Sequence, residues 1–466
     1  MVFSGIEFLY YFLPAVMLIY FFAPKRLKNL MLFVSGLGFY AWGEPIYVIV
    51  MIISTAVDYT AGMLMSKTEN EKKRRACLIV SIVINFGLLF TFKYSSFVVD
   101  TFNGIFRTSI PSPNLPLPIG ISFFTFQSMS YTIDLYRRKI NVQRSFINFA
   151  AYVTCFPQIV AGPIVKYQDI AAELNDRKVS ISDMSDGVSI FIVGLAKKVL
   201  LANNIGIFWS QVKEMDYSTL PALTAWLGII AFTFQIYFDF SGYSDMAIGL
   251  GRMLGFKYPK NFDLPYTSKS VSDFWRRWHI TLGAWFRDYV YIPLGGSRKG
   301  RWKTVRNLAI VWLLTGLWHG ASMNFVLWGA WFGLLIIAEH LGMEKLFERL
   351  PTFFSWLYTM LAVVLGWVLF NTDSLGSALR FVGAMFGAGG SLASGGSWSL
   401  LSQAAVSLAL CIFFSSGAAK NYIKQIGGEG SKVILVLKPV ITAALLIAST
   451  AYLVNSTYNP FLYFNF

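Results

Sequence analysis

The sequence predicts an all-α polytopic membrane protein, and three observations support this. Hydrophobic residues make up 55% of the 466 residues and charged residues only 14%, whereas soluble domains average about 25% charged. The mean hydropathy is +0.55. The apolar residues also fall in runs long enough to cross a bilayer, with short basic loops between them. We expect roughly ten or more transmembrane helices with re-entrant segments, forming a single membrane domain over residues 1–466.

The net charge of +15 points to cytoplasmic loops, because basic loops of membrane proteins stay inside. We therefore expect contact with membrane lipids and no nucleic-acid partner. Cys77, Cys155 and Cys411 match no metal spacing and no disulfide frame. The first 22 residues lack a basic n-region and a small-residue cleavage site, which predicts a first membrane helix and not a removed signal peptide.

The N-terminal part alternates between apolar runs and basic loops. Residues 100–118 carry four prolines and are expected to form a loop. Placing the basic loops 24–29, 67–75 and 137–144 inside gives a consistent alternation with the N-terminus outside. The expected spans are residues 6–23, 30–42, 46–65, 77–98 and 119–136.

An apolar stretch at residues 146–164 contains Pro157, Gly162 and Pro163, which predicts a broken, re-entrant or interfacial segment. Two further spans are expected at residues 187–208 and 221–240, joined by a lightly charged loop that fits outside. The polar stretch before them must then lie inside. The broken segment should therefore enter and leave the membrane on the same side.

The basic centre of the chain lies at residues 252–306. Its twelve Lys and Arg against three Asp supply +9 of the net charge, so we expect short cytoplasmic helices along the membrane face. Spans follow at residues 351–370, 400–414 and 433–454. The Gly/Ser-rich stretch 387–396 should lie outside, as should the C-terminal tail, residues 455–466.

This alternation forces residues 305–340 to begin and end inside, as a hairpin of two helices that breaks at His319 and Gly320. From Val305 to Trp318 a helix rises about 20 Å. His319 should therefore lie deep in the membrane, at a turn, within a cavity reached from the cytoplasm.

Two of the three histidines occur in matching contexts. Trp278 precedes His279, and Trp318 precedes His319. A buried neutral imidazole can act as general base and take the proton of an attacking hydroxyl. One histidine in an apolar helix could be a packing residue, but two in matching contexts favour function.

The positive rim from Arg276 to Lys303 could hold an anionic donor such as a phosphorylated pantetheine thioester. The alternative is that this charge only sets topology and contacts anionic lipids. Asp239 and Asp245 lie close together in the sequence, but a metal site would need more ligands. We expect them to form helix-to-helix hydrogen bonds around a turn at Ser241 and Gly242.

Several motifs resemble the membrane-bound O-acyltransferase superfamily, in particular its bacterial alginate O-acetyltransferase branch. They follow the order of the family and cover the chain from end to end. The matching stretches are PIGISFFTFQSMSYTIDLYR (118–137), CFPQIVAGPI (155–164), GLAKKVLLAN (194–203), FQIYFDFSGYSDMAIG (234–249), NFDLPYTSKSVSDFWRRWHITLGAWFRDYVYIPLGG (261–296), LLTGLWHGASMNFVLWG (313–329) and NPFLYFNF (459–466).

The resemblance implies that His319 is the essential catalytic residue and that His279 is the second characteristic histidine. It also implies a ring of helices around a cytoplasm-facing catalytic funnel in a bacterial inner membrane. The resemblance implies no metal and no tightly bound cofactor. The expected donor is acetyl-CoA or another acyl thioester, free or on a carrier protein. Acetyl should pass outward to a periplasmic or extracellular acetyltransferase partner, or directly to a polysaccharide. Further candidates for donor or substrate contact are Trp275, Arg276, Arg277, Trp278, Trp318, Ser322, Asn324, Asp239 and Tyr243.

Other functions remain open at this point. D-alanyl transfer and the O-acetylation of peptidoglycan or cellulose use similar motifs. A transporter or flippase should show paired broken helices and internal symmetry, and the sequence shows neither. A scaffold of a polysaccharide export complex would perform no chemistry and should tolerate replacement of His319 by alanine.

The charge pattern makes a topology prediction. Single cysteines placed in residues 67–75 or 298–303 should be protected from an impermeant thiol reagent added outside intact cells, whereas cysteines in residues 387–396 should react. Labelling of position 299 from outside would contradict the hairpin.

Overall fold

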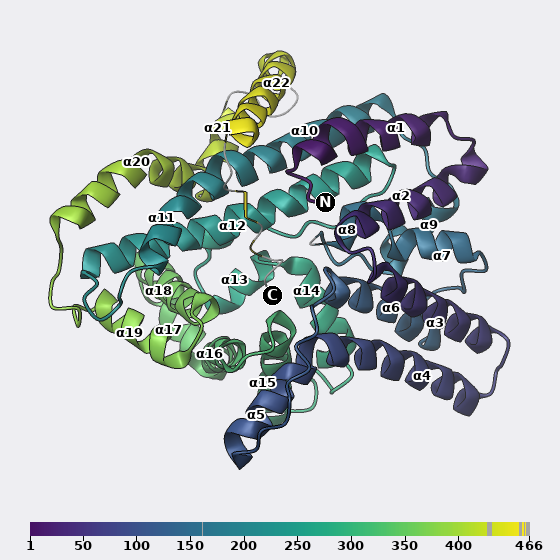
Figure 1. Cartoon of the computed structure of the whole chain (residues 1–466), viewed down its shortest axis with the longest axis horizontal. Helices are drawn as coiled ribbons and strands as arrows, with labels where there is room; N and C mark the ends of the chain where they lie inside the picture. The colour runs from purple at the N-terminus through teal and green to yellow at the C-terminus, as the bar shows by residue number, and fades with distance from the viewer. Residues whose placement is uncertain (161, 426–430, 456–458, 461, 463–466) are drawn as a thin grey trace. The chain divides into compact units, whose positions relative to one another are not determined.

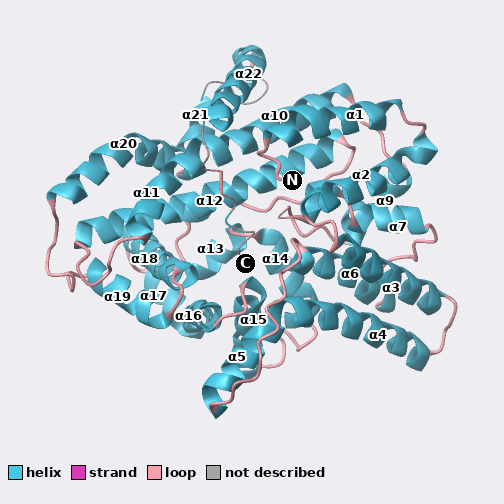
Figure 2. Ribbon diagram, in the orientation of Figure 1, coloured by secondary structure: helices cyan, strands magenta, loops and turns pink. Residues whose placement is uncertain are grey.

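The computed structural model describes residues 1–160, 162–425, 431–455, 459–460 and 462. These residues form helices, turns and loops, with no strand in the described part of the chain (Figure 2). The chain forms two compact units. The first comprises Met1–Phe191 and Ser244–Pro259, and the second comprises Ile192–Tyr243 and Lys260–Phe466.

Eight helical stretches within the described residues are long and apolar enough to cross a membrane. This confirms a polytopic, all-helical membrane protein. The stretches are Val48–Ser66, Glu71–Phe106, Ile181–Lys213, Ala222–Met253, Met323–Met343, Thr352–Asn371, Gly395–Ser415 and Ile434–Asn455. Phe8–Phe22 and Leu375–Met385 are shorter apolar helices.

The first unit contains the N-terminal helices (Figure 1). They are η1 (Phe8–Phe12), α1 (Leu13–Phe22), η2 (Lys25–Leu27), α2 (Lys28–Gly43), α3 (Val48–Ser66), α4 (Glu71–Leu89), η3 (Phe90–Tyr94), α5 (Ser95–Phe106), α6 (Ile121–Tyr136), α7 (Phe146–Val153), α8 (Phe156–Ile159) and α9 (Tyr167–Asn175). Helices α10 (Ile181–Ala196) and α12 (Ala222–Met253) contribute to both units.

Buried hydrogen bonds join α3 to α4. The Asp58 carboxylate accepts from the Ser81 hydroxyl at 2.5 Å and from the Asn85 amide at 2.8 Å. The Ser54 hydroxyl donates to the Asn85 carbonyl oxygen at 2.6 Å. In membrane helices such bonds supply association energy, because apolar side chains gain little by leaving lipid.

The structure differs from one expectation for the N-terminal part and is compatible with another. The proline-rich loop was expected to begin at residue 100, but the preceding helix continues from Glu71 to Phe106. The first proline of the expected loop is Pro111, so no proline interrupts the helix before that point. The segment 146–164 does form two short helices, of eight and four residues. Neither helix is long enough to cross a bilayer. A re-entrant or interfacial segment is expected to contain only such short helices.

The second unit contains the remaining helices. They are η4 (Lys197–Ala202), α11 (Asn203–Lys213), η5 (Pro265–Thr267), α13 (Val271–Arg277), α14 (Ile280–Phe286), η6 (Arg287–Tyr291), α15 (Arg301–His319), α16 (Met323–Ala338), η7 (Glu339–Met343), α17 (Glu344–Glu348), α18 (Thr352–Asn371), α19 (Leu375–Met385), α20 (Gly395–Ser415), α21 (Ala418–Gln425) and α22 (Lys432–Asn455). The basic centre contains the expected short helices η5, α13, α14 and η6, and residues 301–306 begin the longer α15.

The turn expected at Ser241 and Gly242 was wrong, because α12 continues through both residues. Gly242 serves close packing instead. A Cβ at this position would lie 2.7 Å from the Gly194 carbonyl oxygen and 3.0 Å from the Lys198 backbone nitrogen. The glycine thus allows α12 to approach the neighbouring backbone.

The predicted hairpin is formed by α15 and α16, which break at His319 and Gly320. The two helices cross at Gly316 and Gly329. A Cβ on Gly316 would lie 2.3 Å from the Phe325 carbonyl oxygen, and one on Gly329 would lie 2.4 Å from the Trp312 carbonyl oxygen. Backbone packing this close requires glycine on both helices.

Replacing Gly316 by alanine should therefore force the hairpin apart and destabilise the protein. We expect Gly316→Ala to lower the thermal unfolding temperature in detergent, because overpacking a filled contact costs about 1–3 kcal/mol. Gly395→Ala is the matched control, since nothing lies within 4 Å of its Cβ. Equal unfolding temperatures for the two variants would contradict the close crossing.

Candidate functional site

His279 lies in the short break between α13 and α14. Its φ of 45° is in the left-handed region, which is uncommon for residues other than glycine. Neighbouring backbone bonds hold this conformation, since Asp263 N–H donates to the Arg277 carbonyl at 2.9 Å and Ile280 N–H donates to the Asn261 carbonyl at 3.0 Å. Strain that is held in this way is often found at functional sites.

The Asn261 side chain orients the His279 ring. Its Oδ1 lies 3.1 Å from His279 Nδ1 and also accepts from the Thr281 N–H at 3.3 Å and the Thr281 hydroxyl at 3.0 Å. The Thr281 N–H can only donate, so the Asn261 atom that it contacts must be the amide oxygen and not the nitrogen. The same oxygen contacts His279 Nδ1, and because an amide oxygen only accepts, Nδ1 must carry the proton. Nε2 then has the lone pair. Burial lowers the pKa of His279 to about 3, so the ring is neutral at working pH.

His319 is the last residue of α15 and is 2% exposed. Its ring centroid lies 4.8 Å from that of Trp328, 5.0 Å from that of Trp318 and 5.5 Å from that of Phe370. The Trp318 ring also contacts His279, at 6.0 Å. The structure thus brings the two predicted histidines to one aromatic cluster, with Trp318 in contact with both.

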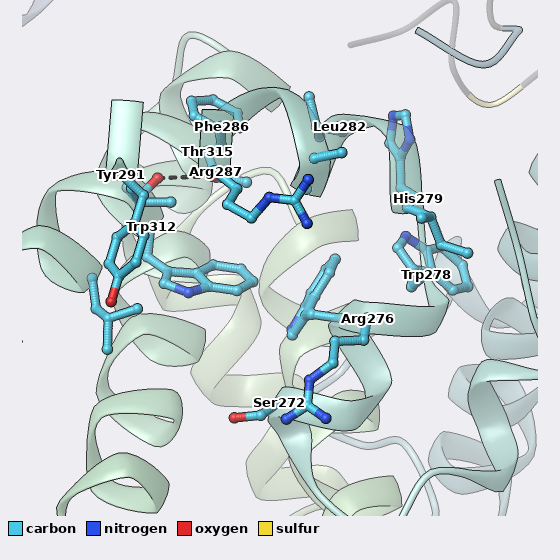
Figure 3. Close-up of a pocket in the computed structure, with 16 residues that line it drawn as sticks. Ser272, Arg276, Trp278, His279, Leu282, Phe286, Arg287, Tyr291, Trp312 and Thr315 are labelled. Atoms are coloured by element: carbon cyan, nitrogen blue, oxygen red, sulfur yellow. Dashed lines mark hydrogen bonds between the residues drawn. The ribbon is translucent and has the colours of Figure 1, made fainter. Parts of the chain in front are cut away.

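A cavity of about 360 Å³ lies beside this cluster and is called the donor-side pocket below. Figure 3 shows Arg276 and Arg287 in the pocket, with Trp312 toward one side and Trp278 and His279 toward the other. No described residue that lines it is acidic. The lining residues are Ser272, Trp275, Arg276, Trp278, His279, Ile280, Leu282, Gly283, Ala284, Phe286, Arg287, Tyr291, Leu308, Val311, Trp312 and Thr315.

The two predicted arginines differ. Arg276 is exposed and lines the pocket, whereas Arg277 bonds to Asp273 at 2.9 Å and does not line it. The Trp275 ring contacts the cluster, 5.4 Å from the Trp328 ring and 4.9 Å from the Trp312 ring. Its buried indole N–H has no acceptor among the described residues, so it could bond to a ligand.

The buried Glu339 carboxylate anchors α13, the helix that carries this pocket wall. It accepts from the Val271 N–H at 2.7 Å, the Ser272 N–H at 2.8 Å and the Ser272 hydroxyl at 2.6 Å. These bonds satisfy two N–H groups at the start of the helix, where a negative charge is also favourable. Glu339 directly follows α16, so one side chain links the hairpin to α13.

Asp239 forms a buried ion pair with Lys198, at 2.7 Å and with both side chains 2% exposed. The pair holds part of the C-terminal tail, because Leu462 N–H donates to Asp239 at 2.9 Å and the Lys198 ammonium donates to the Pro460 carbonyl. Only Asn459, Pro460 and Leu462 of the tail motif lie within the described residues. Tyr243, one turn further along α12, is buried.

A residue that follows His319 is hydrogen-bonded to the lining of a second pocket. Ser322 is the N-cap of α16 without a side-chain cap bond, and the Asn324 amide donates to the Thr372 carbonyl. Thr372 lines a polar cavity of about 260 Å³ just after Phe370, called the far-side pocket below. Its lining residues are Lys213, Met215, Asp216, Tyr217, Asn371, Thr372, Asp373, Ser377 and Arg380.

Sequence reasoning missed the residues that position the candidates. Asn261 opens a motif that carried the resemblance, but nothing in the sequence shows that it bonds to His279. Glu339 and Lys198 act on residues far away in the chain. No group of three or more His, Cys, Asp or Glu that could hold a metal occurs within the described part of the chain.

The sequence is similar to those of several known proteins. The model of the membrane-bound O-acyltransferase family matches residues 121–372. The probable alginate O-acetylase AlgI of Pseudomonas putida is 38% identical over all of both chains. The peptidoglycan O-acetyltransferase of Helicobacter pylori is 34% identical over 82% of this chain and 79% of its own. The teichoic acid D-alanyltransferase of Bacillus subtilis is 27% identical over 55% of this chain and 67% of its own.

The buried ion pair makes a stability prediction. Asp239→Asn should leave the Lys198 ammonium buried without its counter-charge, at a cost of about 3–5 kcal/mol. Replacing both residues with apolar ones should restore much of the loss. Asp263→Asn, in the exposed pair with Lys260, is the control and should change little. Thermal unfolding in detergent measures all three, and equal effects at Asp239 and Asp263 would show that the buried pair is unimportant.

Proposed function

Since the chain belongs to the membrane-bound O-acyltransferase family and is an O-acyltransferase, we propose that it acetylates an exported, alginate-like polysaccharide. It takes acetyl from a thioester on the cytoplasmic side of the inner membrane and passes it across the membrane. The similarity to a probable alginate O-acetylase over the whole of both chains supports the polymer class. The lower identity to a D-alanyltransferase favours acetyl over D-alanyl.

The observation that carries the mechanism is the pair of buried histidines around Trp318. We assign the general base to His319. Its ring takes the proton of an acceptor hydroxyl while that oxygen attacks the thioester carbonyl carbon. The carbon–sulfur bond then breaks, and the leaving thiolate takes up a proton. A neutral imidazole has one ring nitrogen with a free lone pair, which is the group that accepts a proton in general-base catalysis.

The donor-side pocket supports thioester binding from the cytoplasmic side. Arg276 supplies positive charge for the phosphates of a donor such as acetyl-CoA or a carrier-bound pantetheine, whereas Arg287 is paired with Asp288 at 2.8 Å. The buried Trp275 N–H offers a further hydrogen bond. His279, neutral and fixed by Asn261, lines this pocket and would position the thioester against the Trp318 ring.

The far-side pocket supports arrival of the acceptor from the other side. It begins one residue after Phe370, whose ring contacts His319. In the topology expected from the loop charges, the end of α18 faces outward. A hydroxyl of the polymer, or of an extracellular partner acetyltransferase, would approach His319 through this region.

The test is His319→Gln, which keeps size and hydrogen bonding but cannot accept a proton at physiological pH. We expect the variant to insert normally, to bind donor and to lose at least about 10²-fold in transfer rate, the usual scale of general-base catalysis. Transfer of labelled acetyl to polymer is measured beside the amount of protein in membranes. His340→Gln is the matched control, because His340 is exposed and lines neither pocket.

Near-normal acetylation by a well-expressed His319→Gln variant would remove this residue from the mechanism. A loss of equal size in His340→Gln would show that the effect is not specific to the site. Loss of donor binding in His319→Gln would assign the residue to binding and not to proton transfer.

A further inference from the structure

A groove of about 800 Å³ lies in the second unit between α12, α18 and α20, and neither His279 nor His319 lines it. We call it the apolar groove. Its lining is almost entirely hydrophobic, and its one charged residue among the described ones is Lys269. The lining residues are Trp226, Ile230, Thr233, Phe234, Tyr266, Thr267, Lys269, Thr352, Phe353, Trp356, Leu357, Met360, Leu361, Val364, Ile412, Ser415 and Ser416.

Over residues 224–243, helix α12 is accessible to solvent or lipid only along this groove. Between Thr224 and Tyr243 every residue of the helix is buried except Trp226, Ile230 and Phe234. The four-residue spacing places these three side chains on one face. The helix therefore leaves one apolar stripe uncovered, and that stripe forms the groove wall.

The polar groups of the walls are already bonded within the protein. The Tyr266 hydroxyl donates to the Thr233 carbonyl at 2.5 Å, and the Trp356 indole N–H donates to the Tyr266 carbonyl at 2.9 Å. The Ser415 hydroxyl donates to the Ile412 carbonyl at 3.2 Å. Because these polar groups are already bonded, an occupant of the groove contacts mainly hydrocarbon.

The length of the groove matches one leaflet of a bilayer. From Phe353 to Val364 helix α18 rises about 16 Å, which is about half of the ~30 Å hydrocarbon core. All three helices are candidate membrane spans. An occupant that fills the groove along α18 is therefore as long as the apolar part of a single lipid.

One end of the groove is polar and positive. Lys269 lies there with Thr267, Thr352 and Ser416. Lys269 is exposed and belongs to residues 252–306, which carry a charge of +9. A basic residue at a membrane surface attracts anionic lipid headgroups.

We propose that the apolar groove binds an acyl chain of an anionic phospholipid, with the phosphate held at Lys269. The apolar lining of the groove, its length of about one leaflet and the positive charge of Lys269 at one end together favour this occupant. A bound lipid would also support the site. The Tyr266 ring that forms one wall packs against Phe274 at 6.1 Å and against Trp278 at 6.2 Å.

The test uses full-length protein in nanodiscs, with phosphatidylglycerol or phosphatidylcholine that carries a photoreactive group in the same acyl chain. We expect phosphatidylglycerol to label peptides of α12 and α18 about fivefold more than phosphatidylcholine does, the scale for one basic residue at a membrane surface. Lys269→Glu should remove this preference. Lys345→Glu, also exposed, is the charge control and should keep it.

A second pair of variants tests the groove itself. Met360→Trp should fill it and abolish labelling of both helices by either lipid, whereas Val406→Trp, on an outward position of α20 that is 72% exposed, should not. Equal labelling by the two lipids, or unchanged labelling in Met360→Trp, would overturn the proposal. So would cross-linking of the groove to another polypeptide in native membranes. If Met360→Trp does not fold, the surface variant Lys269→Glu still decides the headgroup claim.

Discussion

The close crossing of α15 and α16 at Gly316 and Gly329 is the constraint on which the candidate site depends. With both Cβ atoms absent, each backbone packs directly against a carbonyl of the other helix. This crossing lies one turn before His319, so it fixes where the chain breaks and where the imidazole lies. The Trp312 and Trp328 side chains beside the two glycines then build the aromatic walls of the cluster.

Elsewhere in the second unit, pairs of buried polar groups hold the neighbouring segments in place. Asn261 fixes the His279 ring, and Asp239 and Lys198 neutralise each other beside the tail. A polar group buried without a partner costs about 1–3 kcal/mol, so each of these contacts excludes alternative packings. The left-handed backbone at His279 is tolerated because two hydrogen bonds from neighbouring segments hold it.

Much of this architecture follows from the sequence, because membrane solvation leaves strong local patterns. Apolar runs and basic loops predict the helices, and Gly320 after His319 predicts the break in the hairpin. The pairing of distant residues could not be predicted, since Asn261 and Glu339 lie 18 and 68 residues from their partners. Gly242 was misjudged for a related reason. A glycine that opens a turn and one that admits a neighbouring backbone look the same in sequence, and only the packing distinguishes them.

The Glu339 carboxylate has a mechanical consequence. It ties the end of α16 to the first turn of α13 by three hydrogen bonds, while the start of α16 adjoins His319. Helix α16 therefore sets a fixed distance between the turn at His319 and the wall of the donor-side pocket. Widening the pocket would break bonds to a buried charge, each worth about 1.5–3 kcal/mol. Such a frame holds the width of the pocket fixed, so a ligand that enters it has to match the existing shape.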